Sequence, residues 1–354
     1  MALSKIDVAN MLTGEVPNAN VADLPQSKLE DNINFRNILI NGDMAVSQRA
    51  TSTASLTSGS NFVVDRTMWQ IGTAGTWTVS QDTDVPTGQG FASSLKLDCT
   101  TANGSLSAGS YGILVQRIEG QNLQYLAKGT SDAKSTTLSF WVKTNLTGTY
   151  QVNLNDSDNT RIIGTTYTVS VADTWEKKTL TFAGDTTGAL GNDTGNALQV
   201  EWWFIAGSTY SGGAVPTSWE ATVTTDRSAA SVNLSSSTSN YLNITGIQLE
   251  AATVASDFEV IPYGQNLQRC QRYYIKLNSE IYGNNDKAGT NTNMQNFHMF
   301  RVVMRAAPTI TVGTGSNWTS GPTGASPTVD GFRIYGAGDG AYIDPPGYIA
   351  AAEL

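Results

Sequence analysis

Hydrophobic and polar residues alternate along most of the chain, and this alternation predicts β-strands. In LSFWVK (residues 138–143), Leu, Phe and Val share one face of an extended segment, and Ser, Trp and Lys share the other. LQVEWWFIA (198–206) and YLNITGIQLE (241–250) show similar alternation, and NDSDN (155–159) between two apolar runs is a hairpin signal. Many strands without intervening helices predict an all-β fold, with a jelly-roll β-sandwich over residues 36–262.

The pattern changes in FEVIPYGQNLQRCQRYYIKL (258–277). Five residues there recur at spacings of four, three, four and three: Tyr263, Leu267, Cys270, Tyr274 and Leu277. This spacing predicts a short helical joint over residues 263–275. Its narrow apolar stripe suits packing between copies of the chain better than packing on a globular core. The alternative is a strand that begins at residues 273–277 after a single helical turn.

The two ends of the chain differ from its centre. Residues 276–354 are rich in glycine and predict a small C-terminal β tip domain, with strands around 298–304, 309–313, 332–336 and 341–345. So small a core would gain from packing against copies of itself. Residues 1–35 have few large apolar residues, so we expect an extended N-terminal arm that is ordered only against a partner; a flexible tail is the alternative.

Composition limits the classes of partner. The net charge is −9, which argues against nucleic acid, because binding to phosphates requires clustered Lys and Arg. Two cysteines do not make a disulfide framework and favour a reducing compartment. The first residues do not resemble a signal peptide, and no apolar run approaches the ~20 residues that span a bilayer.

The residues required by common catalytic mechanisms are missing. The single histidine, His298 in MQNFHMF, is expected to fill a strand position, and no zinc, phosphate-loop or nucleophile-elbow motif is present. Paired carboxylates are the remaining enzymatic route, as in glycoside hydrolysis, but sequence spacing does not choose a pair. We therefore expect a protein that is not an enzyme, with a polysaccharide depolymerase as the alternative.

Several long motifs resemble those of bacteriophage tail-fibre and receptor-binding proteins. They include NILINGDMAVSQR (37–49), VDRTMW (64–69), LSFWVKTNLTGTYQV (138–152), FEVIPYGQNLQRCQRYY (258–274) and the final GYIAAAEL. The resemblance implies a homotrimeric virion appendage, assembled in the cytoplasm of the bacterial host, with a jelly roll similar to carbohydrate-binding modules. The five residues at 263–277 would then form a trimer seam.

The resemblance also implies partners. The arm would attach to other virion proteins, and the body or the tip would bind a host cell-surface glycan or outer-membrane component. A structural fibre or capsid decoration protein without a receptor role is the alternative. Neither the host nor the receptor follows from the sequence.

No cofactor is expected, but two acidic clusters are candidates for calcium. Asp156 and Asp158 place oxygen ligands at alternate positions of NDSDN, although a solvated hairpin turn is the favoured interpretation because the remaining EF-hand ligands are missing. Asp43 and Asp65 form the second candidate. They follow from the resemblance, since some carbohydrate-binding modules carry a structural calcium near the corresponding strand.

Aromatic residues are the main candidates for recognition. Trp202 belongs to the apolar face of its strand, whereas Trp141 and Trp203 lie on the opposite faces of theirs. Each of these two is expected either to line a sugar platform or to pack in a trimer interface, and we favour the interface. In the tip, the candidates for receptor binding are Tyr335, Tyr342, Asp344 and Tyr348. A purely structural tip remains the alternative, because Tyr is also common in strands.

Overall fold

The computed structural model describes residues 35–229, 232–282 and 293–354. The predicted arm therefore lies almost wholly outside the described residues. The chain divides into two units, residues 1–36 and 37–354, and the structure described below is that of the second. Within the described ranges, no helix combines the length and the apolar character needed to cross a lipid bilayer.

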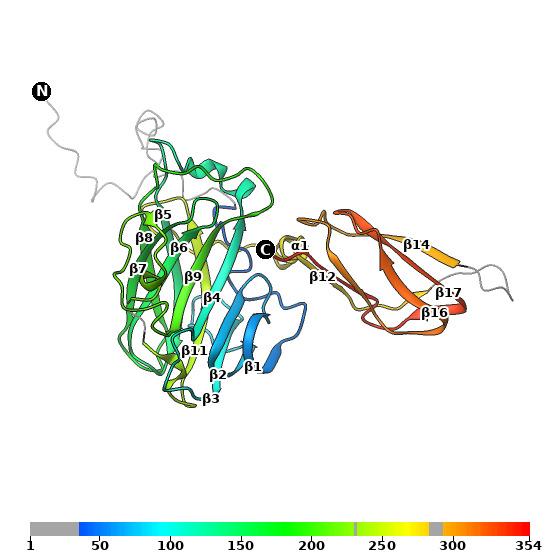
Figure 1. The fold of residues 1–354 in the computed structure, drawn as a ribbon, viewed down its shortest axis with the longest axis horizontal. Helices are drawn as coiled ribbons and strands as arrows, with labels where there is room; N and C mark the ends of the chain where they lie inside the picture. Colours follow the sequence, from blue (N-terminus) through cyan, green and yellow to red (C-terminus); the bar gives the residue numbers. More distant parts are fainter. Residues whose placement is uncertain (1–34, 230–231, 283–292) are drawn as a thin grey trace, which may run out of the picture. The chain divides into compact units, whose positions relative to one another are not determined.

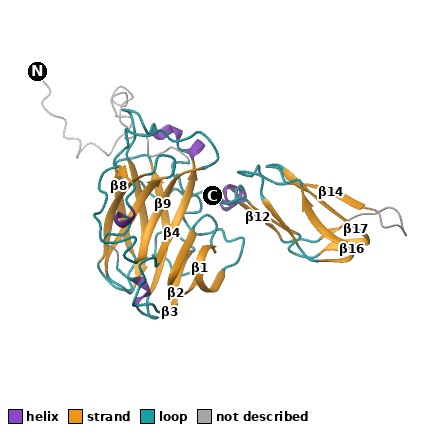
Figure 2. Cartoon of the chain, in the orientation of Figure 1, coloured by secondary structure: helices purple, strands orange, loops and turns teal. Residues whose placement is uncertain are grey.

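The first part of this unit is built almost entirely of strands (Figures 1 and 2). They are β1 (Ser52–Phe62), β2 (Met68–Asp82), β3 (Ser94–Thr101), β4 (Tyr111–Glu119), β5 (Thr136–Thr144), β6 (Gly148–Asp156), β7 (Arg161–Val169), β8 (Glu176–Phe182), β9 (Asn196–Ala206), β10 (Glu220–Ala221) and β11 (Tyr241–Glu250). Short 3-10 helices interrupt the loops at Gly120–Asn122, Gln124–Leu126, Thr224–Asp226 and Leu234–Ser236. The predicted hairpin at NDSDN is confirmed, because β6 and β7 pair on either side of it.

The strands form two layers that share one long strand. Layer A has the order β10-β7-β6-β9-β4 and ends on the first half of β2, and layer B continues from the second half of β2 as β3-β11-β5-β8. Strand β1 pairs along both halves of β2. The chain crosses between layers from β3 to β4, β4 to β5, β5 to β6, β7 to β8, β8 to β9 and β10 to β11. These crossings are those of a jelly roll, so the predicted fold is confirmed.

Aromatic side chains from both layers fill the space between them. Phe140 on β5 of layer B meets Trp202 and Tyr167 of layer A, with ring centroids 6.0 and 5.1 Å apart. All three side chains are buried, and burying a large aromatic side chain contributes roughly 1.5–3 kcal/mol. The alternation in LSFWVK and LQVEWWFIA therefore identifies Phe140 and Trp202 correctly as core residues.

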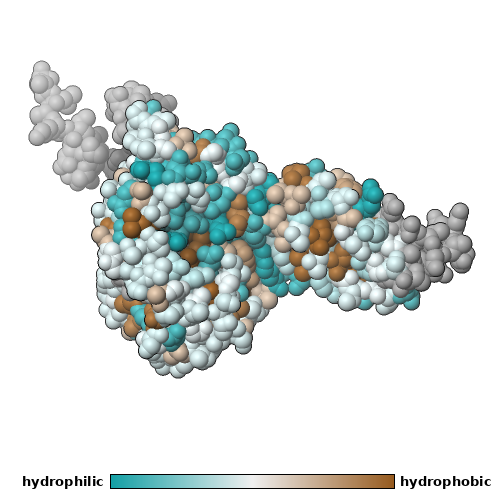
Figure 3. Space-filling model, viewed as in Figure 1, coloured by the Kyte–Doolittle hydropathy of each residue, from teal (hydrophilic) through white to brown (hydrophobic). Residues whose placement is uncertain are grey.

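The outer face of layer A is mostly polar. Gln151 and Asn153 on β6 lie beside Glu201 on β9, and all three are buried beneath residues 226–227, which accept hydrogen bonds from both amide side chains. Over the sandwich, the face shown in Figure 3 is mainly hydrophilic to neutral, with scattered hydrophobic spots. This face does not present a broad apolar surface to a partner.

The helical joint is shorter than the sequence predicts. Helix α1 covers Tyr263–Gln271, and β12 (Tyr274–Leu277) follows directly. Tyr274 and Leu277 therefore lie on a strand, which is the alternative considered above. Tyr263 is 59% exposed, whereas Cys270 is fully buried within its own chain.

The proposed seam of Tyr263, Leu267, Cys270, Tyr274 and Leu277 is thus not a continuous helical stripe. The reason is tertiary: β12 pairs with β18 (Tyr348–Ala351), and this pairing extends the backbone from Tyr274 onward. A spacing of four and three does not distinguish nine helical residues followed by a strand from four complete turns.

The C-terminal part contains two small sheets. One has the order β12-β18-β15, with β15 at Thr309–Val312. In the other, β17 (Gly331–Ile343) pairs with β13 (Ile281–Tyr282), β14 (Asn293–Met299) and β16 (Gly315–Ala325). Their shared core includes Phe300, Phe332, Ile343 and Tyr348.

Three of the strands predicted in this region need correction. The strand predicted at 298–304 ends at Met299, where the chain turns so that Phe300 and Met304 enter the core. The strands predicted at 332–336 and 341–345 belong to one strand, β17, which pairs with β14 and with β16 and ends at Ile343. His298 lies on β14 as expected, and burial lowers its pKa.

A cluster of charged side chains fastens residues 272–273 and the C-terminal residues to the sandwich. We call Glu119, Arg272, Tyr273, Arg66 and Glu353 the joint cluster. Arg272 donates two hydrogen bonds to the carboxylate of Glu119, at 2.8 and 2.7 Å, and Tyr273 donates a third. Arg66 pairs with Glu353 and lies over the Tyr273 ring, 3.4 Å from its centroid. The buried Glu119 is therefore neutralised by a neighbouring cation and by donors at both of its oxygens.

Candidate functional site

An open pocket of about 270 Å³ lies on the outer face of layer B. Its floor contains Ser139 and Trp141 of β5, which point away from the core because their neighbours Leu138, Phe140 and Val142 point inward. Two loops form its walls: residues 88–91, between β2 and β3, and residues 257–260, after β11. The pocket thus gathers segments that are far apart in the sequence.

Three aromatic rings line this pocket. Phe91 and Phe258 come from opposite walls and meet edge to face, with centroids 5.0 Å apart and an interplanar angle of 71°. Trp141 is half-buried and supplies the third ring. Flat rings at a partly exposed surface can pack against the apolar faces of a ligand.

A glycine makes room for these rings. Gly246 lies where β11 bulges against β5, and its φ of +61° is unfavourable for residues with a side chain. A Cβ atom at this position would lie 2.6 Å from the Phe91 ring and 3.1 Å from Trp141. The bulge therefore lets two aromatic rings approach the backbone from the outer face.

Polar groups of both signs surround the rings. Lys177 on β8 lies directly across from Trp141 in the strand register. Asp43, Asp257, Gln89 and Ser139 provide carboxylate, amide and hydroxyl groups. Together they supply hydrogen-bond donors and acceptors of the kind that sugar hydroxyls require.

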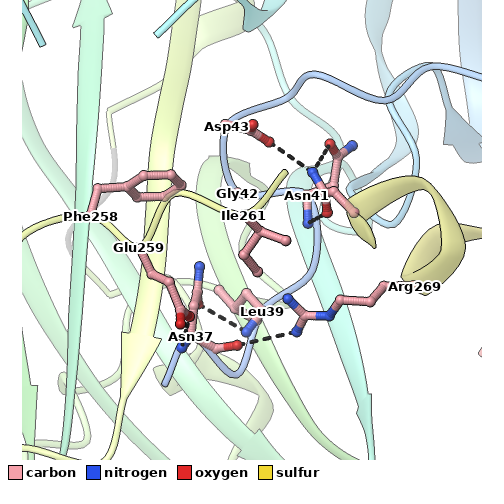
Figure 4. Close-up of a pocket in the computed structure, with 10 residues that line it drawn as sticks. Asn37, Leu39, Asn41, Gly42, Asp43, Phe258, Glu259, Ile261 and Arg269 are labelled. Atoms are coloured by element: carbon pink, nitrogen blue, oxygen red, sulfur yellow. Dashed lines mark hydrogen bonds between the residues drawn. The ribbon is translucent and has the colours of Figure 1, made fainter. Parts of the chain in front are cut away.

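A smaller cavity lies next to the pocket and shares two of the residues that line the pocket (Figure 4). Asp43 and Phe258 line both cavities. The smaller one has a volume of about 10 Å³, which is room for roughly one water molecule. A cavity of this size is too small for a sugar, so we assign it a structural role.

Hydrogen bonds between segments fix this region. The Asn266 side chain on α1 donates to Asp43 at 3.1 Å and to Asn41 at 3.3 Å. The backbone of Asn37 donates to Glu259 at 2.9 Å and its carbonyl accepts from Arg269 at 3.2 Å (Figure 4). Burial raises the pKa of Asp43, and hydrogen bonds from the Ala45 backbone and the Asn266 side chain oppose that shift without cancelling it.

Trp203 does not have the exposure that the sequence suggests. It lies on the outer face of layer A, as expected from its position, but only 1% of it is exposed. Tyr210 packs on its ring at 5.3 Å, and the Arg227 guanidinium lies 5.0 Å from it. The loop after β9 thus covers it, so neither a sugar platform nor a trimer interface is available at Trp203. Of the two tryptophans, only Trp141 lines the pocket.

The candidate receptor residues of the tip do not form one site. Tyr348 is 5% exposed and packs against Phe332 with ring centroids 4.8 Å apart, so it is a core residue. Tyr335 is 43% exposed, and Tyr342 lies seven positions further along β17. The buried neighbours Ile334 and Ile343 turn both rings away from the tip core, but seven residues of extended chain separate them by up to roughly 23 Å along the strand. Asp344 is half-buried just beyond the strand.

The carboxylates that the sequence offers as calcium ligands are engaged with groups of the protein itself. Asp156 pairs with Lys128 and accepts backbone hydrogen bonds from Asp158 and Asn159, both at 3.0 Å, as in a hairpin turn. Asp158 accepts a hydrogen bond from the backbone of Gly191 at 2.8 Å.

The second pair is engaged in the same way. Asp65 is 1% exposed and accepts hydrogen bonds from Gln48, while burial raises its pKa to about 6. Asp43 bonds to Asn266, as described above. Among the described residues, no three His, Cys, Asp or Glu side chains are grouped so that they could hold a metal ion. Calcium at either cluster stays a prediction.

Phe91, Phe258, Gly246 and Lys177 were not identified from the sequence. The first two lie in loops, where alternation gives no direction for a side chain. Lys177 is recognisable only through its pairing with Trp141, which requires the order of β5 and β8. A glycine inside a strand pattern, as at Gly246, is the one signal that was available, because such glycines mark bulges.

The fold and the pocket define a class: an all-β jelly-roll protein with an open, aromatic-lined pocket on the outside of one layer. No protein-family model and no curated protein sequence matches the chain.

Solved structures do match it. The enzymatically active domain of tailspike protein 4 of bacteriophage CBA120 is 13% identical with a TM-score of 0.33, and the match covers 61% of this chain and 22% of that one. A family 11 carbohydrate-binding module of a Clostridium thermocellum cellulase is 10% identical with a TM-score of 0.28, covering 56% and 99%. A xylan-binding domain of carbohydrate-binding module family 22 is 11% identical with a TM-score of 0.29, covering 60% and 99%. Values of this size do not assign a function to this chain.

Proposed function

We propose that this chain is a glycan-binding, non-enzymatic appendage of a bacteriophage virion, and that it works as a homotrimer. The observation that carries the binding function is the pocket on layer B, where the Trp141, Phe91 and Phe258 rings lie among Lys177, Asp257 and other polar groups. The virion assignment rests on the sequence motifs that resemble phage tail-fibre proteins. The N-terminal residues would attach the protein to the virion, and the pocket would contact the host surface.

The pocket favours a sugar over other small molecules for two reasons. It is open and only about 270 Å³ in volume, whereas enclosed sites for small molecules usually span about 300–1,000 Å³. It also combines flat rings with donors and acceptors at its edge, as a ring of carbon atoms bearing hydroxyls requires. A single open site of this kind binds weakly. Three copies in a trimer, repeated over a virion, would raise the effective affinity through multivalency.

Binding to an array of bacterial surface oligosaccharides tests this function. We expect the purified protein to bind a restricted set of glycans without releasing reducing sugar from them. Absence of binding to every glycan would refute the proposal. Release of reducing sugar would point instead to hydrolysis, with Asp43 and Asp257 as the two carboxylates of the pocket.

The oligomeric state is a separate prediction. Light scattering coupled to size-exclusion chromatography is expected to give about three times the mass of the 37.7 kDa chain. The small core of the C-terminal sheets is the physical reason, because burial between copies would add to it. A mass of one chain would contradict the trimer while leaving the pocket intact.

A further inference from the structure

The charged groups of the pocket are separated across Trp141. Strands lie in the order β11-β5-β8, with Trp141 on the middle strand and Lys177 on β8. Asp43 lies on the β11 side, because its neighbour Gly42 accepts a hydrogen bond from Ile247 at 2.9 Å. Asp257 is on the same side, since its carbonyl accepts from Gln248 at 3.2 Å. The two carboxylates and the ammonium group therefore flank the ring from opposite sides.

Lys177 differs from two nearby lysines in that its ammonium group has no partner within the described part of the chain. Lys143 pairs with Asp84 at 2.7 Å, and Lys178 pairs with Glu176 at 2.5 Å. Lys177 is exposed, and within the described part of the chain its ammonium group has neither an ion pair nor a hydrogen bond. In a chain with a net charge of −9, an unpaired cation beside an aromatic platform is available to a ligand.

We infer that the pocket binds a sugar residue that bears one anionic group, with its ring on Trp141 and the anionic group at Lys177. The hydroxyls on the far side of the sugar would then face Asp43 and Asp257, which accept hydrogen bonds from them. A carboxylate, as in a uronic acid, and a sulfate ester share this chemistry. The inference rests on the proposed glycan-binding function and adds the class of glycan.

The test uses an array of paired oligosaccharides: uronic and sialic acid oligomers, their carboxyl-reduced forms, and sulfated counterparts of the reduced forms. We expect the wild-type protein to prefer the acidic member of a pair by about tenfold or more, because a charge-assisted hydrogen bond is roughly twice as strong as a neutral one. Higher salt should reduce this preference, because Lys177 is exposed. The sulfated members show whether a carboxylate is specifically required.

Two variants complete the test. Lys177→Met is expected to abolish the preference for acidic members, whereas Lys134→Met, which removes another exposed lysine, one outside the pocket, should preserve it. Equal binding of acidic and reduced members by the wild type would overturn the inference while the glycan-binding function stands. An acidic preference retained by Lys177→Met would also overturn it. No binding to any oligosaccharide would refute the inference and the proposed function together.

Discussion

Trp141→Ala is expected to lower the affinity for the glycan by about 30-fold or more, as truncation of a central aromatic contact commonly does. The physical reason is that Trp141 provides the ring on the pocket floor, while Phe91 and Phe258 belong to the walls. The Trp141 side chain is half-buried and points away from the core, so the fold should be retained. Titration calorimetry with an oligosaccharide from the array measures the affinity, and circular dichroism checks the fold.

The same variant distinguishes the two roles considered for this residue. If Trp141 packed in a trimer interface, its truncation would reduce the mass in solution. The pocket predicts an unchanged mass and lost binding. Tyr125→Ala is the matched control, because Tyr125 is a 47% exposed aromatic side chain outside the pocket. Similar losses of binding in both variants would show that the effect is not specific to the pocket.

Glu119→Ala is expected to reduce the free energy of unfolding by about 3–5 kcal/mol, because it leaves the Arg272 charge without its partner in a largely buried setting. Burial by itself would raise the pKa of Glu119, but hydrogen bonds from Arg272 and Tyr273 outweigh it and lower the pKa below the ordinary value. The depressed pKa means that Glu119 stabilises the fold above its unfolded-state pKa. This stabilisation is lost as the pH falls through the lower, folded-state value. Chemical denaturation near pH 7 therefore measures the full effect.

Two comparisons show whether the joint cluster acts as a unit. Glu176→Ala removes a carboxylate that is 17% exposed, against 0% for Glu119, from its ion pair with Lys178, and it should cost about 1 kcal/mol or less. The double variant Glu119→Ala with Arg272→Ala should cost about as much as either single change, because each removes the same interaction. If the double variant lost as much stability as the two single variants added together, Glu119 and Arg272 would not be coupled.

The alternation of residues determined the fold class, the two-layer sandwich and several core positions. Phe140 and Trp202 were assigned correctly because the direction of a side chain in a strand depends only on its position within that strand. The β6–β7 hairpin followed from local turn chemistry in the same way. The motifs that resemble those of phage tail-fibre proteins suggested a role, but they did not locate a binding site.

The pocket could not be read from the sequence, because its lining residues come from separate segments that only the order of the strands brings together. The pairing of β5 with β8 places Lys177 beside Trp141, and the bulge at Gly246 admits Phe91. Tertiary contacts also decided which aromatic residues are exposed: a loop covers Trp203, and the tip core encloses Tyr348. Sequence alternation states which face of a strand a residue occupies, whereas burial of that face depends on what the rest of the chain lays over it.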